Sequence, residues 1–295
     1  MKEQYVGDVN DYRKYALLRA LADGGENRIG VCWMLTPSDG STDGNKRAYL
    51  QHPAKHRHHD PELFDILAGV RDDSDHRRLR HIEESGAISG ARYFNEQLYD
   101  NASERRAYME ACRAAFADVD LVFFDPDNGL EVKKPRIGHQ GSSKFLFEEE
   151  LAACYATGKS VLVYQHFPFI PRDVFIASCV ERLRRLGPDA TVGTYQTAHV
   201  VFLLLLNPRS PARLANAAQK AATLWDPKFI AGTLYEPVQP ETVLENEEST
   251  VTVETPPPRQ SVQDEPEAPH PADSSREDER PQRPSLLRRL VARLR

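Results

Sequence analysis

The amino-acid sequence predicts an α/β domain built on a mostly parallel, doubly wound, Rossmann-like sheet over residues 1–235. Two observations predict this fold class. Short, nearly continuous apolar runs, which are typical of strands covered on both faces, alternate along the chain with segments of helical period. The chain has 295 residues, of which 40% are hydrophobic, and this is enough apolar material for one substantial core.

Apolar runs predict strands over residues 28–35, 121–124, 160–164, 191–195 and 199–206. The last two leave little room for a helix between them, so we expect an antiparallel pair. Helical spacing of apolar residues predicts helices over residues 12–22, 61–70, 75–84, 103–117, 148–157, 172–186 and 211–224. The segments between these elements are predicted loops, and the last helix is expected to close the domain.

The composition changes near residue 236. Residues 236–284 are rich in Pro, Glu and Ser, cannot bury enough apolar area to offset the entropy of ordering, and are predicted to be disordered. Residues 285–295 place leucines on one helical face and arginines on the other. Two interpretations of this end stay open. It is either a short amphipathic basic helix that docks a protein partner or an anionic surface, or a solvated basic terminus.

Several classes of protein are disfavoured by composition. No run of 18 apolar residues is present and the first residues lack a secretory signal, so we expect no transmembrane segment and a cytoplasmic protein. The four cysteines are widely spaced without a CxxC pair, which favours free thiols over a zinc site. Residues 1–240 hold 30 Lys and Arg against 32 Asp and Glu, so the net charge gives no indication of nucleic-acid binding, which local basic clusters would have to supply.

The first candidate site is the loop Asp125-Pro126-Asp127-Asn128-Gly129, directly after the predicted strand 121–124. Ligands of parallel α/β sheets bind beyond the carboxyl ends of the strands. Two carboxylates and an amide in this loop can bind an amino group, coordinate a cation or transfer a proton. The alternative is an ordinary polar turn, because Asn-Gly is a common turn pair.

The second candidate is the segment 7–15, which leads into the first predicted helix. Asp8, Asn10 or Asp11 can cap that helix. Capping needs only one of them, so the others and Lys14 are candidates for binding.

The third candidate is the Gly- and Ser-rich loop 36–46 after the first predicted strand, where nucleotide cofactors sit in α/β folds. It matches neither the P-loop nor the GxGxxG pattern. A flexible surface loop is the alternative reading.

Two histidine motifs complete the candidates. His166 follows the predicted strand 160–164 and is placed to act as a base, a ligand or a hydrogen-bond donor, although a lone histidine is more often structural. His52, His56, His58 and His59 lie close in sequence but lack a flanking carboxylate or cysteine pattern, so we expect a solvated loop and no metal site there.

The segment 7–15 and the Asp125 loop together resemble two signatures of the class I methyltransferase fold. The large-subunit ribosomal RNA adenine-N6 methyltransferases open with a G-N-x-A-D-x-x-K-H-like segment, to which Gly7-Asp8-Val9-Asn10-Asp11-Tyr12-Arg13-Lys14-Tyr15 is similar. Those enzymes also place a D-P-P-Y tetrad after their fourth strand, and its counterpart here is Asp125-Pro126-Asp127-Asn128. Three-Cys-motif partner proteins share the opening segment and a D-P-x-x loop. The resemblance covers residues 5–206 in layout.

The resemblance implies a methyltransferase-type sheet and S-adenosylmethionine as cofactor. The residues implied to hold the cofactor are Gly7, Asp8, Asp11, Lys14, Thr36, Ser38, Asp39 and Gly40. It also implies that Asp125 accepts a hydrogen bond from a target amine, for which a nucleic acid is one candidate source, and that catalysis is mainly positioning. Asp127 and Asn128 replace the second Pro and the aromatic residue of the tetrad, so Tyr12, Tyr15, Phe167 or Phe169 would have to stack on a base. Asp127 beside Asp125 favours a cation or an amine over a neutral base edge.

Two other functions remain open from the sequence. A metal-dependent phosphoesterase or nuclease would use Asp8, Asp125, Asp127 and His166 around Mg²⁺ or Mn²⁺. A non-catalytic adaptor would keep the fold and dock a partner through residues 285–295.

Overall fold

The computed structural model describes residues 1–37, 44, 46–70 and 78–237. Contacts within the chain divide it into two units, Met1–Glu241 and Thr242–Arg295. The first unit is described below. The predicted linker from residue 238 onward and the predicted helix 285–295 lie outside the described residues.

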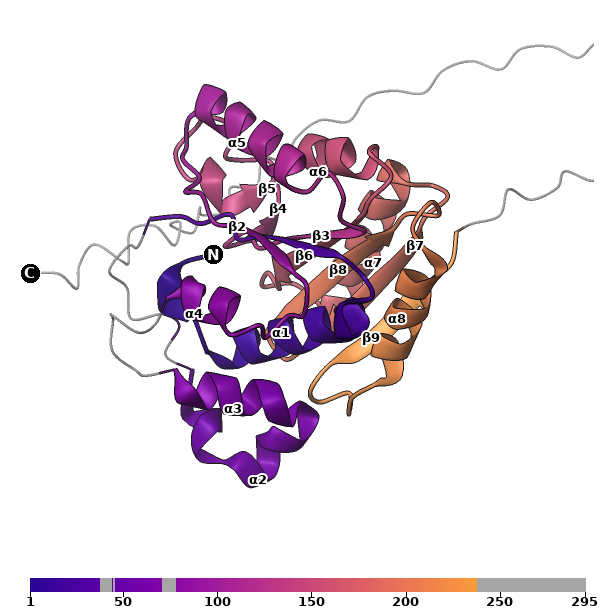
Figure 1. Cartoon of the computed structure of the whole chain (residues 1–295). Coiled ribbons are helices and arrows are strands. Elements are labelled where there is room, and N and C mark those ends of the chain that lie inside the picture. Colours follow the sequence, from indigo (N-terminus) through magenta and orange to yellow (C-terminus); the bar gives the residue numbers. More distant parts are fainter. Residues whose placement is uncertain (38–43, 45, 71–77, 238–295) are drawn as a thin grey trace, which may run out of the picture. The chain divides into compact units, whose positions relative to one another are not determined.

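The centre of the first unit is a seven-stranded sheet, which confirms the predicted α/β class (Figure 1). Its strands, in spatial order, are β2 (Arg92–Phe94), β1 (Ile29–Cys32), β3 (Leu121–Phe124), β6 (Ser160–His166), β8 (Val200–Leu206), β7 (Thr191–Gln196) and β9 (Ala231–Tyr235). The first four are parallel to one another, whereas β8 runs antiparallel to both of its neighbours. The predicted antiparallel pairing of the last two apolar runs is therefore confirmed.

Helices cover both faces of this sheet (Figure 1). One face is covered by α1 (Val9–Ala22), α3 (Pro61–Gly69), α4 (Leu79–Glu84) and α8 (Ala212–Thr223). The other face is covered by α5 (Ala102–Ala115), α6 (Glu148–Tyr155) and α7 (Arg172–Leu186). The short helix α2 (Pro53–His56) precedes α3, and a two-stranded sheet pairs β4 (Gly129–Leu130) with β5 (Phe145–Leu146).

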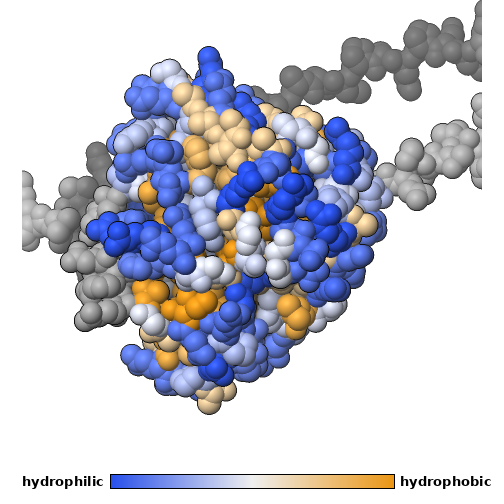
Figure 2. Space-filling view, viewed as in Figure 1, coloured by the Kyte–Doolittle hydropathy of each residue, from blue (hydrophilic) through white to orange (hydrophobic). Residues whose placement is uncertain are grey.

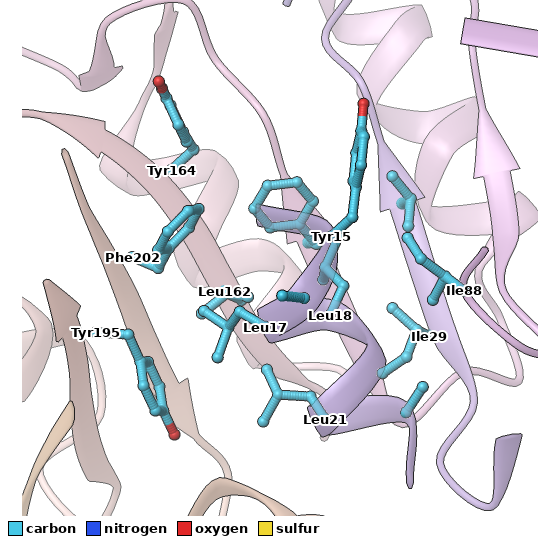
Figure 3. Close-up of a cluster of buried hydrophobic side chains, with 14 of the residues drawn as sticks. Tyr15, Leu17, Leu18, Leu21, Ile29, Ile88, Leu162, Tyr164, Tyr195 and Phe202 are labelled. Atoms are coloured by element: carbon cyan, nitrogen blue, oxygen red, sulfur yellow. The ribbon is translucent and has the colours of Figure 1, made fainter. Parts of the chain in front are cut away.

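Alternation of side chains along the strands divides the core between the two faces. In β8, Phe202 and Leu204 face α1 and its neighbours, whereas Leu203 and Leu205 face α5 to α7. Figure 3 shows the first cluster, in which Leu162 and Phe202 from the sheet meet three leucines of α1, namely Leu17, Leu18 and Leu21. Burial of each such side chain contributes about 2 kcal/mol, so this packing fixes α1 against the sheet.

Four strands, namely β2, β4, β5 and β9, and several short helices were not predicted from the sequence. The strand β2 has only three residues, none of them fully buried, and β9 follows α8, so the last predicted helix does not close the domain. Residues 53–56 and 57–59 form α2 and a 3-10 helix where a solvated histidine loop was expected. The helix predicted over 75–84 is described only from Leu79, because residues 71–77 lie outside the description.

One face of the molecule is mainly hydrophilic. Hydrophilic residues cover most of the face shown in Figure 2, and strongly hydrophobic ones appear in a few patches. Within the described part of the chain, no helix has the length and apolarity that a membrane span requires. Cys32, Cys112, Cys154 and Cys179 are all buried free thiols, as the sequence predicted.

Candidate functional site

A pocket of about 450 Å³ opens at the carboxyl ends of β3 and β6, beside the first turn of α1. Segments far apart in the sequence line it, namely the first residues, the start of α1, the loop after β3 and the end of β6. The lining side chains that carry charge or a hydrogen-bonding group include Asp8, Asn10, Asp11, Lys14, Lys46, Asp125, Asp127, Asn128, Lys144, Tyr164 and His166. The structure therefore brings the Asp125–Gly129 loop, the segment 7–15 and His166 together at one cavity.

Lys14 links α1 to the loop after β3 through a buried charge network. Its Nζ donates to Oδ1 of Asp11 and to Oδ2 of Asp125, each at 2.7 Å, and all three side chains are almost fully buried. Burial alone would lower the pKa of Lys14, but the two carboxylates outweigh it and the pKa is raised, so Lys14 is an ammonium ion. Tyr15 donates to the other oxygen of Asp11 at 2.9 Å, which completes the network.

An α-ammonium group is bound at the carboxyl ends of β1 and β3. The amino group of Met1 donates to the main-chain oxygen of Asp125 at 2.8 Å and to that of Met34 at 3.2 Å. It also forms an ion pair with Oδ1 of Asp127 at 2.9 Å. Two main-chain carbonyls and one carboxylate therefore form a cradle for an α-ammonium group, which we call the ammonium cradle.

Asp127 is held in this cradle by the loop after β1. The hydroxyl of Thr36 donates to its Oδ2 at 2.8 Å. Burial alone would raise the pKa of Asp127. The α-ammonium of Met1 and the Thr36 hydroxyl outweigh this effect and lower the pKa, so the carboxyl is ionised. Thr36 was predicted to hold the cofactor, and Ser38, Asp39 and Gly40 of the same prediction lie outside the described residues.

Asp8 and Asn10 occupy the first turn of α1 at the wall of the pocket. Oδ1 of Asp8 caps the helix by accepting from the main-chain N–H groups of Asn10 and Asp11, at 2.7 and 2.9 Å. Burial, together with the negative charge of Asp11, raises the pKa of Asp8 to about 7. The side-chain oxygen of Asn10 is buried and has no hydrogen-bond partner within the described residues.

Gln165 holds the Asp125–Gly129 loop from the neighbouring strand β6. Its Oε1 accepts from the main-chain N–H of Leu130 at 2.7 Å, and its Nε2 donates to the main-chain oxygen of Asn128 at 3.1 Å. Gly129 has a φ of +113°, and a Cβ there would meet the Gln165 amide at 2.2 Å, so the loop needs a glycine at this position. Sequence reading missed Gln165, although a lone amide at the end of an apolar strand is a usable signal.

His166 and Tyr164 form the far side of the pocket. The imidazole lies 3.3 Å from the Tyr164 hydroxyl. Partial burial lowers the pKa of His166, and so do the positive charges of Lys14 and Lys46. The negative charge of Asp127 raises it, but by less. Figure 3 shows the hydroxyl groups of Tyr15 and Tyr164 pointing toward the same end of the view, away from that of Tyr195.

Other predicted groups lie elsewhere. Gly7 does not line the pocket, but its main-chain oxygen accepts from the Tyr49 hydroxyl at 3.1 Å. Tyr12 and Tyr15 are fully buried and so offer no exposed ring for stacking. Phe167 packs edge-on against Phe175, whereas Phe169 is fully exposed.

The predicted metal ligands of the alternative reading do not form a metal cluster. Asp8, Asp125, Asp127 and His166 all line the pocket. Within the described residues, however, no group of three or more His, Cys, Asp or Glu side chains has an arrangement that could hold a metal ion. The same finding covers the four histidines between residues 52 and 59.

Comparisons with known proteins add little to this geometry. No family model matches the chain, and no curated protein matches it. Among solved structures, the chain is similar to LPL1258 from Legionella pneumophila, a protein assigned to the family model DUF519. The two have 10% sequence identity and a TM-score of 0.38, over 79% of this chain and 98% of the other. A likeness this low says nothing about activity.

Proposed function

We propose that this chain is an S-adenosylmethionine-dependent methyltransferase-like protein that acts on an amine. The observation that carries the proposal is the ammonium cradle. S-adenosylmethionine is an α-amino acid derivative, and its α-ammonium group can replace that of Met1 on the main-chain oxygens of Met34 and Asp125 and on the carboxylate of Asp127.

The position of the cradle in the sheet supports the same proposal. It lies beyond the carboxyl ends of β1 and β3, which are adjacent parallel strands from which the chain continues to opposite sides of the sheet. This is the switch point at which α/β sheets bind nucleotide-containing ligands.

The chemistry of the pocket fits a cationic cofactor. When bound, S-adenosylmethionine supplies an electrophilic methyl group on a positively charged sulfur. Asp8, Asp11, Asp125 and Asp127 place four carboxyl groups at the pocket, which Lys2, Lys14, Lys46, Lys144 and the α-ammonium of Met1 also line. At the ammonium cradle itself, the buried carboxylate of Asp127 stabilises positive charge. The volume of about 450 Å³ lies within the range of pockets for small ligands.

Asp125 has a narrower role in this proposal than the tetrad resemblance implied. Lys14 occupies its Oδ2, and its main-chain oxygen belongs to the ammonium cradle. Asp125 therefore anchors both the cofactor site and α1, and only Oδ1 remains to accept from an amine.

Ligand binding by the full-length chain tests the proposal. S-adenosylhomocysteine should raise the melting temperature, since a ligand at 100 times its Kd adds about 2.7 kcal/mol of stability. Methylthioadenosine lacks the α-ammonium and carboxylate groups, so it should bind at least tenfold more weakly. Asp127→Asn should weaken S-adenosylhomocysteine about tenfold, because a hydrogen bond to a charged group contributes about 1.5–3 kcal/mol, and should leave methylthioadenosine unchanged.

Two outcomes would contradict the proposal. If S-adenosylhomocysteine gives no shift at millimolar concentration, the cofactor assignment is wrong. A shift with Mg²⁺ or Mn²⁺ in its place would favour the metal-dependent phosphoesterase that the sequence left open. The adaptor reading gains if neither kind of ligand binds.

A further inference from the structure

The first turn of α1 presents two incompletely bonded side chains to the pocket. Asp8 and Asn10 are only 6% and 8% exposed. Oδ1 of Asp8 is used by the helix cap, whereas its Oδ2 has no hydrogen-bond partner within the described residues. Oδ1 of Asn10 is buried and likewise unpartnered there. Buried acceptors are nearly always satisfied, so the open Oδ1 of Asn10 at the pocket wall indicates a missing donor.

The charge around these two acceptors selects for a positively charged donor. Asp11 and Asp125 share the ammonium of Lys14, so that one positive charge is already matched by two carboxylates. Among the described residues, no cation lies within hydrogen-bonding distance of Asp8. Burial and the charge of Asp11 raise the pKa of Asp8 to about 7, so it exchanges a proton near neutral pH.

We propose that Asp8 and Asn10 form the acceptor subsite and that this subsite takes a primary alkylammonium ion. The inference rests on the proposed methyltransferase function and names its substrate class. Asn10 Oδ1 accepts one N–H of the ammonium and orients it, and Asp8 accepts the proton that the nitrogen must lose. Asp8 is thus a catalytic residue, because it touches the reacting nitrogen.

The proton and electron balance of the step is simple. Asp8 takes one proton from R–NH3⁺, which leaves a nitrogen lone pair. That lone pair forms the N–CH3 bond while the methyl–sulfur bond of the cofactor breaks and its electron pair stays on sulfur. The product leaves as R–NH2⁺–CH3, and Asp8 returns its proton to water.

An alkylammonium fits these residues better than the exocyclic amine of a nucleobase. A nucleobase amine is not protonated at neutral pH, so it brings no positive charge to the Asp8 carboxylate. It also gains from an aromatic ring to stack on, but Tyr12 and Tyr15 are buried, and neither Phe167 nor the exposed Phe169 lines the pocket. A nucleic-acid substrate, the partner considered from the sequence, is therefore the less favoured source of the amine.

The test measures binding of butylammonium chloride to the full-length chain by calorimetry, in saturating S-adenosylhomocysteine, between pH 6 and pH 8. A carboxyl with a pKa of about 7 becomes roughly tenfold more ionised across this range. Butylammonium affinity should therefore rise about tenfold, whereas neutral butanol should bind at least tenfold more weakly at pH 8. Saturating S-adenosylhomocysteine keeps the probe out of the ammonium cradle.

Substitutions separate Asp8 from the other charged or titratable groups that face it. These groups are Asp11, Arg13, Lys14 and Tyr15 of α1, the α-ammonium, Lys2 and Tyr5 at the start of the chain, Lys46, Tyr49, Asp125, Asp127, Tyr164 and His166. Asp8→Asn keeps the cap, since Asn is an equally good N-cap, and should abolish the pH dependence and lower the affinity at pH 8 about tenfold. Asn10→Ala should lower the affinity and keep the pH dependence. Asp60→Asn, at the cap of α3, is the matched control and should change neither.

The outcomes distinguish this inference from the proposed function. If S-adenosylhomocysteine does not bind, the function is wrong, and the butylammonium titration without it still tests the subsite. If S-adenosylhomocysteine binds but Asp8→Asn retains the wild-type pH dependence, the subsite is wrong and the function stands. Binding of butanol as tight as that of butylammonium would also overturn the inference.

Discussion

Asp8 caps α1 with a carboxyl group that burial and the charge of Asp11 make costly to ionise. Its pKa of about 7 in the folded chain lies above the ordinary value of 3.8 for an aspartate. Between these two values the folded state binds more protons than the unfolded state, so the free energy of unfolding falls as the pH rises from about 4 to 7. Above pH 7 Asp8 is ionised in both states, so the full cost of ionising it in the folded state lowers the free energy of unfolding.

Replacing Asp8 by Asn should therefore stabilise the protein at pH 8 while the cap is retained. We expect a gain of about 1–3 kcal/mol at pH 8, since one pKa unit corresponds to about 1.4 kcal/mol. The gain should shrink as the pH falls toward 4. Urea unfolding at pH 4, 6 and 8 measures it. An offset between Asp8→Asn and wild type that does not vary with pH would mean that Asp8 has an ordinary pKa.

Lys14 is the residue on which the buried network depends most. Lys14→Met keeps the length of the side chain but leaves the carboxylates of Asp11 and Asp125 unpaired, both almost fully buried. Removal of one partner from a buried ion pair costs about 3–5 kcal/mol. Arg185→Met removes an exposed pair with Glu181 on α7 and should change stability by less than about 0.5 kcal/mol.

The measurement for Lys14 is the free energy of unfolding of both variants at pH 7. Adding Asp125→Asn to Lys14→Met should recover part of the loss, because it removes one of the unpaired charges. If Lys14→Met were as mild as the Arg185 control, the network would not be the link between α1 and the loop after β3.

At the scale of elements, the loop after β3 is shaped by the contact between Gly129 and Gln165. Gly129→Ala forces a Cβ into a residue with a φ of +113° and to within 2.2 Å of the Gln165 amide. We expect a loss of about 2–4 kcal/mol from backbone strain and the displaced amide. Gly158→Ala also has a positive φ, of +88°, but meets nothing within 4 Å, so it should lose only about 1 kcal/mol.

Thermal melts compare the two glycine variants directly, and binding of S-adenosylhomocysteine adds a second readout. Because the loop carries Asp125 and Asp127, Gly129→Ala should also weaken that ligand, whereas Gly158→Ala should not. Equal losses of stability would mean that positive φ alone, and not the Gln165 contact, determines the cost.

Elements with a strong local pattern were predictable. The strand 121–124 and the helix 172–186 have the predicted bounds, because each is a run whose period and ends are visible in the sequence. The strand β2 was not predictable, because its residues are half-exposed and its place is determined by pairing with β1. The edge strand β9 pairs only with β7, and its half-buried residues carry no clear period.

The site was predictable in position and not in connectivity. A polar loop after a buried strand indicated where a ligand would bind, and Asp8 was visible as a cap. No local signal pairs Lys14 with Asp125, which lies 111 residues away, or aligns Gln165 with the main chain of residues 128 and 130. Such contacts arise only when parallel strands bring their carboxyl ends to one edge of the sheet.

At the scale of the whole molecule, the two core clusters share one sheet. Strands β1, β3, β6 and β8 contribute alternate side chains to both clusters, so neither face can lose its packing without exposing the other side of the same strands. This arrangement favours a single cooperative unfolding transition for the first unit. Every described residue of the two clusters lies before residue 237.

A chain that ends at Glu241 should therefore unfold in urea with the same midpoint as the full-length protein. The expectation follows from the division of contacts at this residue and from the position of both clusters before it. Far-ultraviolet circular dichroism reports the sheet and helices, while fluorescence reports Trp33, buried at the end of β1, and the half-buried Trp225 after α8. The two signals should give coincident transitions in both chains. If the free energy of unfolding of the shorter chain were lower by more than about 1 kcal/mol, residues beyond Glu241 would contribute to the stability of the first unit. Separate transitions in the two signals would show that the two faces of the sheet unfold independently.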